Sequence, residues 1–98
     1  MKLVLNRAYG GFALSEEQAK AYGVPEEDMF DGFGGKVYYD YDLERTDPKL
    51  IEVIELGLEN AWASSLDVVE IPDGVHYKIQ EYDGWEYLIW SESEIHFV

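Results

Sequence analysis

The residues best suited to bind a ligand form a turn near the N-terminus, where Tyr9-Gly10-Gly11-Phe12 follows Arg7. Glycine lets a ligand approach the backbone, arginine can clamp an anion, and an aromatic ring can stack on a planar ligand. The pattern therefore predicts a cradle for a phosphate-bearing molecule. It also fits a tight strand-to-helix connection that needs positive φ angles, because no complete nucleotide-binding fingerprint is present.

Three residues elsewhere in the chain are candidates for the same site. Arg45 precedes the main helix and could approach the pole of the sheet that carries the turn, although a surface ion pair with Glu44 or Asp42 is favoured. Tyr82 and Trp85 flank a hairpin turn and could belong to the core, a pocket or a subunit interface. The complete set of predicted ligand-binding residues is Asn6, Arg7, Tyr9, Gly10, Gly11, Phe12, Arg45, Tyr82 and Trp85.

Residue types that support catalysis or metal binding are scarce or poorly spaced. The chain has no cysteine, and its two histidines, His76 and His96, form no ligand-spaced pair. Four aspartates lack the twelve-residue calcium-loop pattern and are better read as a solvated acidic loop; they are Asp28, Asp31, Asp40 and Asp42. We therefore expect no enzyme activity, no metal and no cofactor.

The charge balance restricts the possible partners. The chain contains 21 acidic residues and seven basic ones, which gives a net charge of −14. Such a field repels nucleic acid and attracts a basic protein surface. No apolar run approaches the ~20 residues of a membrane span. These features predict one cytoplasmic domain over residues 1–98 that binds neither nucleic acid nor membranes.

Apolar runs and capping signals predict the N-terminal elements. Leu3-Val4-Leu5 indicates a buried strand over 2–7. Ser15 and Gln18 form a capping-box pattern that opens a helix over 15–23, which Gly23 should end. Residues 24–35 then form the longest candidate loop, and residues 36–41 are either an edge strand or an ordered loop.

Asp47 as N-cap and Pro48 at the first helical position predict the start of the main helix. Apolar residues at helical spacing predict its buried stripe, with Gly57 inside the helix at a close helix–sheet contact. The stripe residues are Leu50, Ile51, Ile54, Leu58, Ala61 and Trp62.

The C-terminal third reads as strands. A run over 66–71 is followed by two alternating segments around the turn Asp83-Gly84, which is a strong hairpin signal. Residues 95–98 could close the sheet or pack as a tail. The expected fold class is α/β, more narrowly α+β: a small two-layer sandwich of a mixed sheet of about four strands, a C-terminal antiparallel hairpin and two helices.

Two sequence blocks carry a family resemblance. The N-terminal block runs from Asn6 to Ser15 with the pattern NRxYGGFxLS, and the C-terminal block joins Glu70-Ile71-Pro72-Asp73-Gly74 to Glu81-Tyr82-Asp83-Gly84. Together with the opening of the main helix at Arg45, these blocks resemble a family of small proteins encoded by bacteriophages and prophages. The resemblance implies a host-takeover or counter-defence role in the host cytoplasm.

Two functions remain open. In the first, the chain sequesters a small anionic, nucleotide-derived immune signal at the glycine turn without catalysis. In the second, its acidic surface mimics nucleic acid and blocks a basic surface of a host nuclease or DNA-binding protein. Exposed aromatics near the C-terminus, among them Trp85, Tyr87 and Trp90, also predict a homo-oligomer.

Overall fold

The computed structural model describes residues 1–32, 34–40 and 42–91. Residues 95–98, for which a closing strand and a packed tail are the alternatives, lie outside this part of the chain, as does His96. The elements are β1 (Lys2–Asn6), β2 (Leu14–Ser15), α1 (Glu16–Tyr22), the 3₁₀ helix η1 (Glu26–Asp28), β3 (Phe30–Gly32), β4 (Gly35–Tyr38), α2 (Pro48–Glu55), β5 (Leu66–Glu70), β6 (His76–Tyr82) and β7 (Trp85–Ser91).

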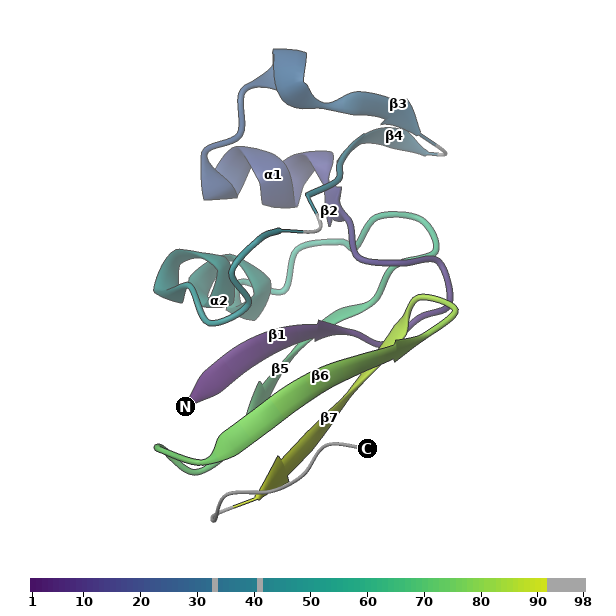
Figure 1. Ribbon diagram of the computed structural model, residues 1–98. Coiled ribbons are helices and arrows are strands. Elements are labelled where there is room, and N and C mark those ends of the chain that lie inside the picture. Colours follow the sequence, from purple (N-terminus) through teal and green to yellow (C-terminus); the bar gives the residue numbers. More distant parts are fainter. Residues whose placement is uncertain (33, 41, 92–98) are drawn as a thin grey trace.

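The predicted α+β class, with two helices and a C-terminal antiparallel hairpin, is confirmed (Figure 1). The described strands pair antiparallel in three small sheets, β1-β5, β2-β4-β3 and β6-β7, in place of one mixed sheet of about four strands. One cause lies between β1 and β7, where the side chain of Glu86 accepts the Asn6 N–H at 2.8 Å. A side chain therefore takes a backbone donor that could otherwise have joined the two sheets in one ladder.

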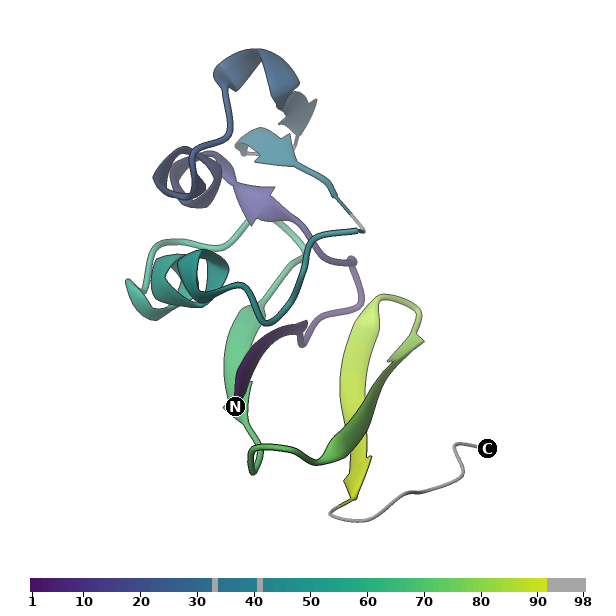
Figure 2. The same ribbon diagram turned by 60° about the vertical axis from the view of Figure 1, so that its left-hand side comes forward.

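Strand β1 lies between two halves of the core. Its alternation turns Val4 toward the helices, where it packs in one apolar cluster with Leu14 and Leu50. Leu3 and Leu5 face the other way, into a second cluster between the β1-β5 sheet and the β6–β7 hairpin. Figure 2 shows the hairpin facing that sheet, with the chain curved around the space between them. All three leucine and valine side chains of β1 are fully buried.

Helix α1 begins and ends as its sequence predicts. The Ser15 hydroxyl accepts the Gln18 N–H, and the Gln18 side chain accepts the Ser15 N–H, so the capping box is complete. Gly23 ends the helix with φ of 104°, a left-handed conformation that glycine adopts readily. Helix α2 likewise starts at the predicted cap, because Asp47 accepts the Lys49 N–H at 2.9 Å.

The predicted length of α2 is wrong. The helix ends at Glu55, and Gly57, expected inside it, follows the helix with φ of 74°. The buried residues of α2 are Leu50 and Val53. The apolar residues after the helix belong elsewhere: Ala61 packs in a separate small cluster and Trp62 is 70 % exposed. Their helical spacing was therefore coincidental.

The segment expected to be a long loop contains regular structure. Within residues 24–35, η1 is followed by β3, which forms a hairpin with β4. Strand β4 is the central strand of its sheet, with β2 on its other side, so the alternative of an edge strand is wrong. This small sheet and α1 form one end of the molecule, which extends over 43 × 26 × 20 Å (Figure 1).

Candidate functional site

The glycine turn meets the tip of the β6–β7 hairpin, and a pocket of about 500 Å³ opens between them. The fold thus brings together residues that are more than 70 positions apart in the chain. Five of the nine predicted ligand-binding residues line this pocket. Its lining is Tyr9, Gly10, Gly11, Phe12, Arg45, Glu81, Asp83, Gly84 and Glu86.

Arg45 lines this pocket and is already paired. Its guanidinium group binds both carboxylate oxygens of Glu86, with Nη2 at 2.8 Å from Oε2, and both side chains are largely buried. Its Cζ lies 3.8 Å from the centre of the Phe12 ring, a cation–π contact. The expected surface ion pair of Arg45 with Glu44 or Asp42 is wrong. Glu86 largely neutralises the Arg45 charge, which weakens any role for this residue as an anion clamp.

Asn6 is fully buried and holds the turn to the hairpin. Its Nδ2 donates to the carbonyl oxygens of Ala8 and Gly84, both at 2.8 Å, and its Oδ1 accepts the Ser65 N–H at 3.0 Å. Its backbone N–H donates to Glu86. With both amide donors and the oxygen bound to the chain, Asn6 has a structural role here. We call Asn6, Phe12, Arg45, Gly84 and Glu86 the junction.

Close packing explains two glycines of the site. A Cβ on Gly10 would lie 2.0 Å from the Ala63 carbonyl oxygen, and one on Gly84 would lie 2.6 Å from the Gly11 nitrogen. Neither position can hold a larger residue without a shift of the chain. Gly11 differs, because a Cβ there meets nothing within 4 Å but φ is +91°. The glycine pattern thus has a structural explanation that needs no ligand.

Two of the aromatic candidates, Tyr9 and Phe12, line the pocket, whereas Tyr82 and Trp85 lie outside it. The Tyr9 and Trp85 rings contact each other with centroids 5.1 Å apart and planes tilted by 48°. Tyr82, the cross-strand neighbour of Trp85, is 73 % exposed. Neither Tyr82 nor Trp85 lines the pocket, and both are too exposed to be core residues.

Arg7, the remaining candidate, is half-buried beside the pocket and is not part of its lining. Its backbone N–H donates to the Ser65 carbonyl oxygen at 2.7 Å, which fixes the start of the turn. Within the described residues, its guanidinium group makes no ion pair or hydrogen bond. Arg7 is therefore a cation next to the turn that none of the described carboxylates neutralises directly.

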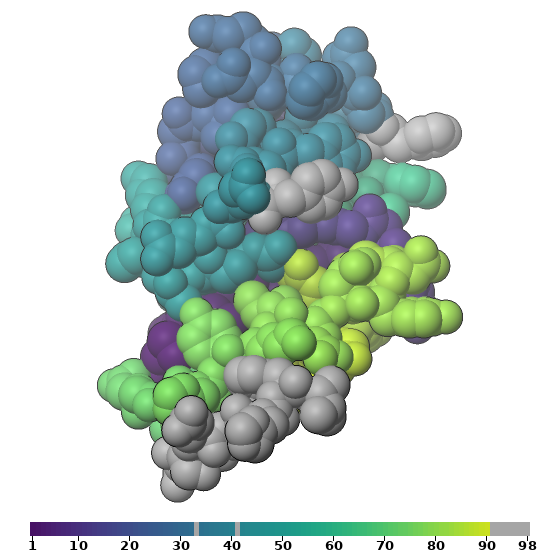
Figure 3. All heavy atoms as spheres, viewed as in Figure 1, coloured from purple at the N-terminus to yellow at the C-terminus, as the bar shows by residue number. Residues whose placement is uncertain are grey.

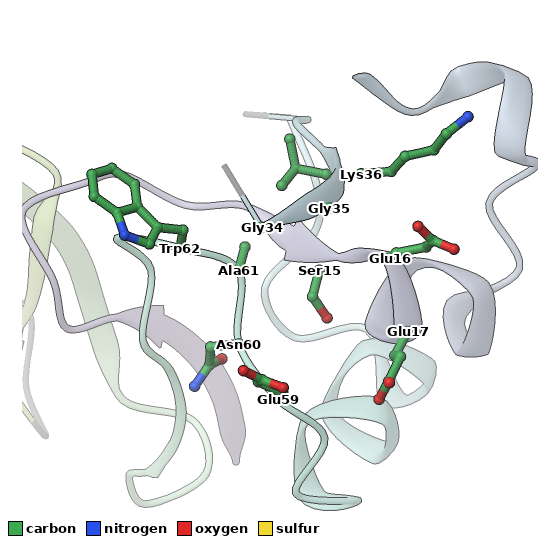
Figure 4. Close-up of a pocket in the computed structure, with 11 residues that line it drawn as sticks. Ser15, Glu16, Glu17, Gly34, Gly35, Lys36, Glu59, Asn60, Ala61 and Trp62 are labelled. Carbon is green, nitrogen blue, oxygen red and sulfur yellow. The ribbon is translucent and has the colours of Figure 1, made fainter. Parts of the chain in front are cut away.

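Acidic side chains outnumber basic ones in the lining of two pockets of this protein. The pocket at the turn carries Glu81 and Asp83 in addition to the paired Glu86. A second pocket of about 390 Å³ lies between the start of α1, the start of β4 and residues 59–62 (Figure 4). It is lined by Glu16, Glu17 and Glu59, while its lysine, Lys36, extends toward Glu26 and pairs with it at 3.3 Å. A phosphate would meet unfavourable charge in either pocket.

No group of three or more histidine, cysteine, aspartate or glutamate side chains within the described ranges is placed to hold a metal ion. His76 is exposed on β6. In the same part of the chain, no helix has the length and apolar character needed to cross a bilayer.

Comparisons with protein-family models, curated proteins and solved structures find no match to this chain.

Sequence reasoning missed Glu86, which completes the junction. A signal for it exists in the strand alternation. Glu86 and Leu88 share one face of β7, and Leu88 packs in the second apolar cluster. A glutamate on a buried face requires a cation or several donors, because an unpaired buried charge is strongly unfavourable. That requirement points to an arginine, and the chain contains only two.

Proposed function

We propose that this protein acts by binding and not by catalysis, and that its acidic surface occupies a basic surface of a partner protein. The observation that carries the proposal is the carboxylate lining of both pockets, three acidic residues in each. The chain as a whole has the same sign of charge, with a net charge of −14. A field of this kind draws a basic partner into contact and speeds its association.

The distribution of cations supports this proposal. Among the described residues, at least four of the seven basic side chains pair with carboxylates, so these four add little positive potential to the surface. The pairs are Lys2–Glu55, Lys20–Glu16, Lys36–Glu26 and Arg45–Glu86. The remaining carboxylates far outnumber the remaining cations. A protein that binds the DNA backbone presents the complementary charge.

The class of partner follows from this charge and from the resemblance to phage-encoded proteins. We propose a nuclease or DNA-binding protein of the host defence as the partner, met in the host cytoplasm. The acidic chain then occupies the partner's nucleic-acid site and itself binds neither nucleic acid nor membranes. Inhibition by charge mimicry requires no cofactor.

Sequestration of a small anionic, nucleotide-derived signal is the second candidate. One observation favours it: Arg7 lies beside the turn with no ion pair to a described carboxylate. Tyr9, 63 % exposed, could stack on a base near that cation. The acidic lining of the adjacent pocket weighs against it.

A competition assay separates the two candidates. The chain is titrated into complexes of purified basic nucleases with a labelled DNA duplex, at increasing salt, and released DNA is measured. Charge mimicry predicts displacement that weakens steeply with salt. Replacing the two exposed pocket carboxylates, Glu81→Lys with Asp83→Lys, should weaken displacement, whereas Arg7→Ala should leave it unchanged or improve it.

Calorimetry with a mixture of cyclic and linear nucleotides tests the second candidate. If the protein acts by charge mimicry, it should bind none of these nucleotides, and the titration should show no heat of binding. Nucleotide binding by the wild type that Arg7→Ala abolishes in a folded protein would overturn the proposal of charge mimicry in favour of sequestration. Failure to displace DNA from any nuclease at low salt would count against charge mimicry directly.

A further inference from the structure

The outer face of the β6–β7 hairpin differs in character from the rest of this acidic molecule. Ile79 and Leu88, which are paired across the two strands, pack in the second apolar cluster and define the inner face. Alternation places the neighbouring residues on the outer face. These are His76, Lys78, Gln80 and Tyr82 on β6 with Trp85, Tyr87 and Ile89 on β7.

None of these seven residues carries a carboxylate, although the chain has 21 acidic residues. The acidic residues of the two hairpin strands, Glu81 and Glu86, are on the inner face with Ile79 and Leu88. The outer face is thus an aromatic area that carries one lysine, Lys78, and no carboxylate, on a strongly negative protein. Figure 3 shows the yellow-green hairpin at the surface of the molecule.

The exposed aromatic area on this face is large for a small protein. Tyr82 is 73 % exposed, Tyr87 42 % and Trp85 37 %, and Tyr9, which contacts Trp85, is 63 % exposed. With about 200 Å² for each ring, the exposed parts amount to roughly 400 Å². A patch of roughly 400 Å² falls within the range of the largest apolar patch on a monomer, which is often functional, and it is about half of the ~800 Å² that each partner contributes to a standard interface.

We propose that the outer face of the β6–β7 hairpin is the interface between two copies of this chain. The two copies meet isologously, so the aromatic area (Tyr9, Tyr82, Trp85 and Tyr87) of one packs on the same area of its partner. Aromatic rings contribute large contact area at low entropic cost, and their pairing adds to the gain from burial.

Charge identifies a second copy as the occupant. Two chains of net charge −14 repel each other wherever carboxylates face carboxylates. The carboxylate-free outer face is where they can approach with least repulsion. A basic partner, by contrast, finds no carboxylate on this face and is attracted to the acidic surfaces around the pockets. The proposed dimer face therefore uses other side chains than the carboxylates of the proposed binding function, although Tyr9 borders both.

Sedimentation equilibrium from micromolar to submillimolar concentration tests this interface. We expect the mass to rise from 11.3 kDa toward twice that value. Added salt should tighten the dimer, because it screens the repulsion between the two chains. Binding to a basic partner should instead weaken with added salt. The salt dependence therefore shows which of the two proposals has failed.

Tyr82→Glu should weaken dimerisation at least tenfold, because it buries a carboxylate against its own copy. Phe30→Glu is the matched control, because Phe30 is 61 % exposed and lies on β3 in another sheet; it should leave the dimer intact. Tyr9→Ser removes one ring without altering the hairpin and should weaken the dimer even if Tyr82→Glu fails to fold. A monomeric wild type at submillimolar concentration, or equal weakening by Phe30→Glu, would overturn the proposal.

Discussion

Removing the carboxylate of Glu86 should destabilise the protein more than removing any exposed carboxylate. In the folded chain, Glu86 binds the Arg45 guanidinium group through both oxygens and accepts the Asn6 N–H. The exposed fractions of the Arg45 and Glu86 side chains are 13 % and 8 %. Glu86→Ala therefore leaves a largely buried cation without its counter-charge and a buried N–H without an acceptor.

Breaking a buried pair in this way costs about 3–5 kcal/mol of unfolding free energy. The total for a domain of this size is about 5–15 kcal/mol, so much of the stability should be lost. Urea unfolding followed by tryptophan fluorescence measures the change. With a urea m-value of about 1.5 kcal/mol/M, the midpoint should fall by about 2–3 M.

Two further variants make the comparison specific. Glu55→Ala removes one partner of the exposed Lys2–Glu55 pair, at 2.9 Å, and should change the midpoint far less. The double variant Arg45→Leu/Glu86→Leu should recover part of the loss, because no charge then stays buried. If Glu86→Ala and Glu55→Ala shift the midpoint equally, the junction is not a buried ion pair and the reasoning is refuted.

Other substitutions test the turn, the core and the helix caps. Gly10→Ala should cost about 3 kcal/mol or more, since its Cβ would lie 2.0 Å from a backbone oxygen, whereas Gly11→Ala should cost only the ~1–2 kcal/mol of its positive φ; urea unfolding compares the two. Leu50→Ala should cost about 2–5 kcal/mol in the same assay, because Leu50 is fully buried. The hydrogen bond from Tyr22 to Asp47 raises the pKa of Tyr22 to about 12 and lowers that of Asp47. Its stabilisation should be lost as pH rises from 10 toward 12, or falls below 3.8, and Tyr22→Phe should flatten both limbs of the thermal-unfolding profile.

Local signals in the sequence predicted local structure well. The Ser15–Gln18 capping box, the Asp47 cap and the Asp83-Gly84 turn each involve residues within a few positions of one another. Each depends on backbone geometry that the residue types themselves favour. Such features need no knowledge of the rest of the chain.

The end of α2 and the junction could not be predicted in the same way. Residues Leu58, Ala61 and Trp62 continue a helical spacing by coincidence, and only the left-handed conformation of Gly57 shows that the helix has already ended. The partner of Arg45 is 41 positions away, whereas sequence reasoning chose adjacent acids. Strand alternation places Glu86 on a buried face, but which cation it meets depends on how the sheets pack, and no local pattern records that.

The Asn6 side chain also bears on the order in which the protein folds. Its hydrogen bonds span 59 positions to Ser65 and 78 positions to Gly84. Closing loops of that length is entropically unfavourable until the contacts form. Such contacts therefore form late in folding and slow it. Asn6 should therefore act as a latch, formed after the rate-limiting step, and its removal should accelerate unfolding while the folding rate changes little.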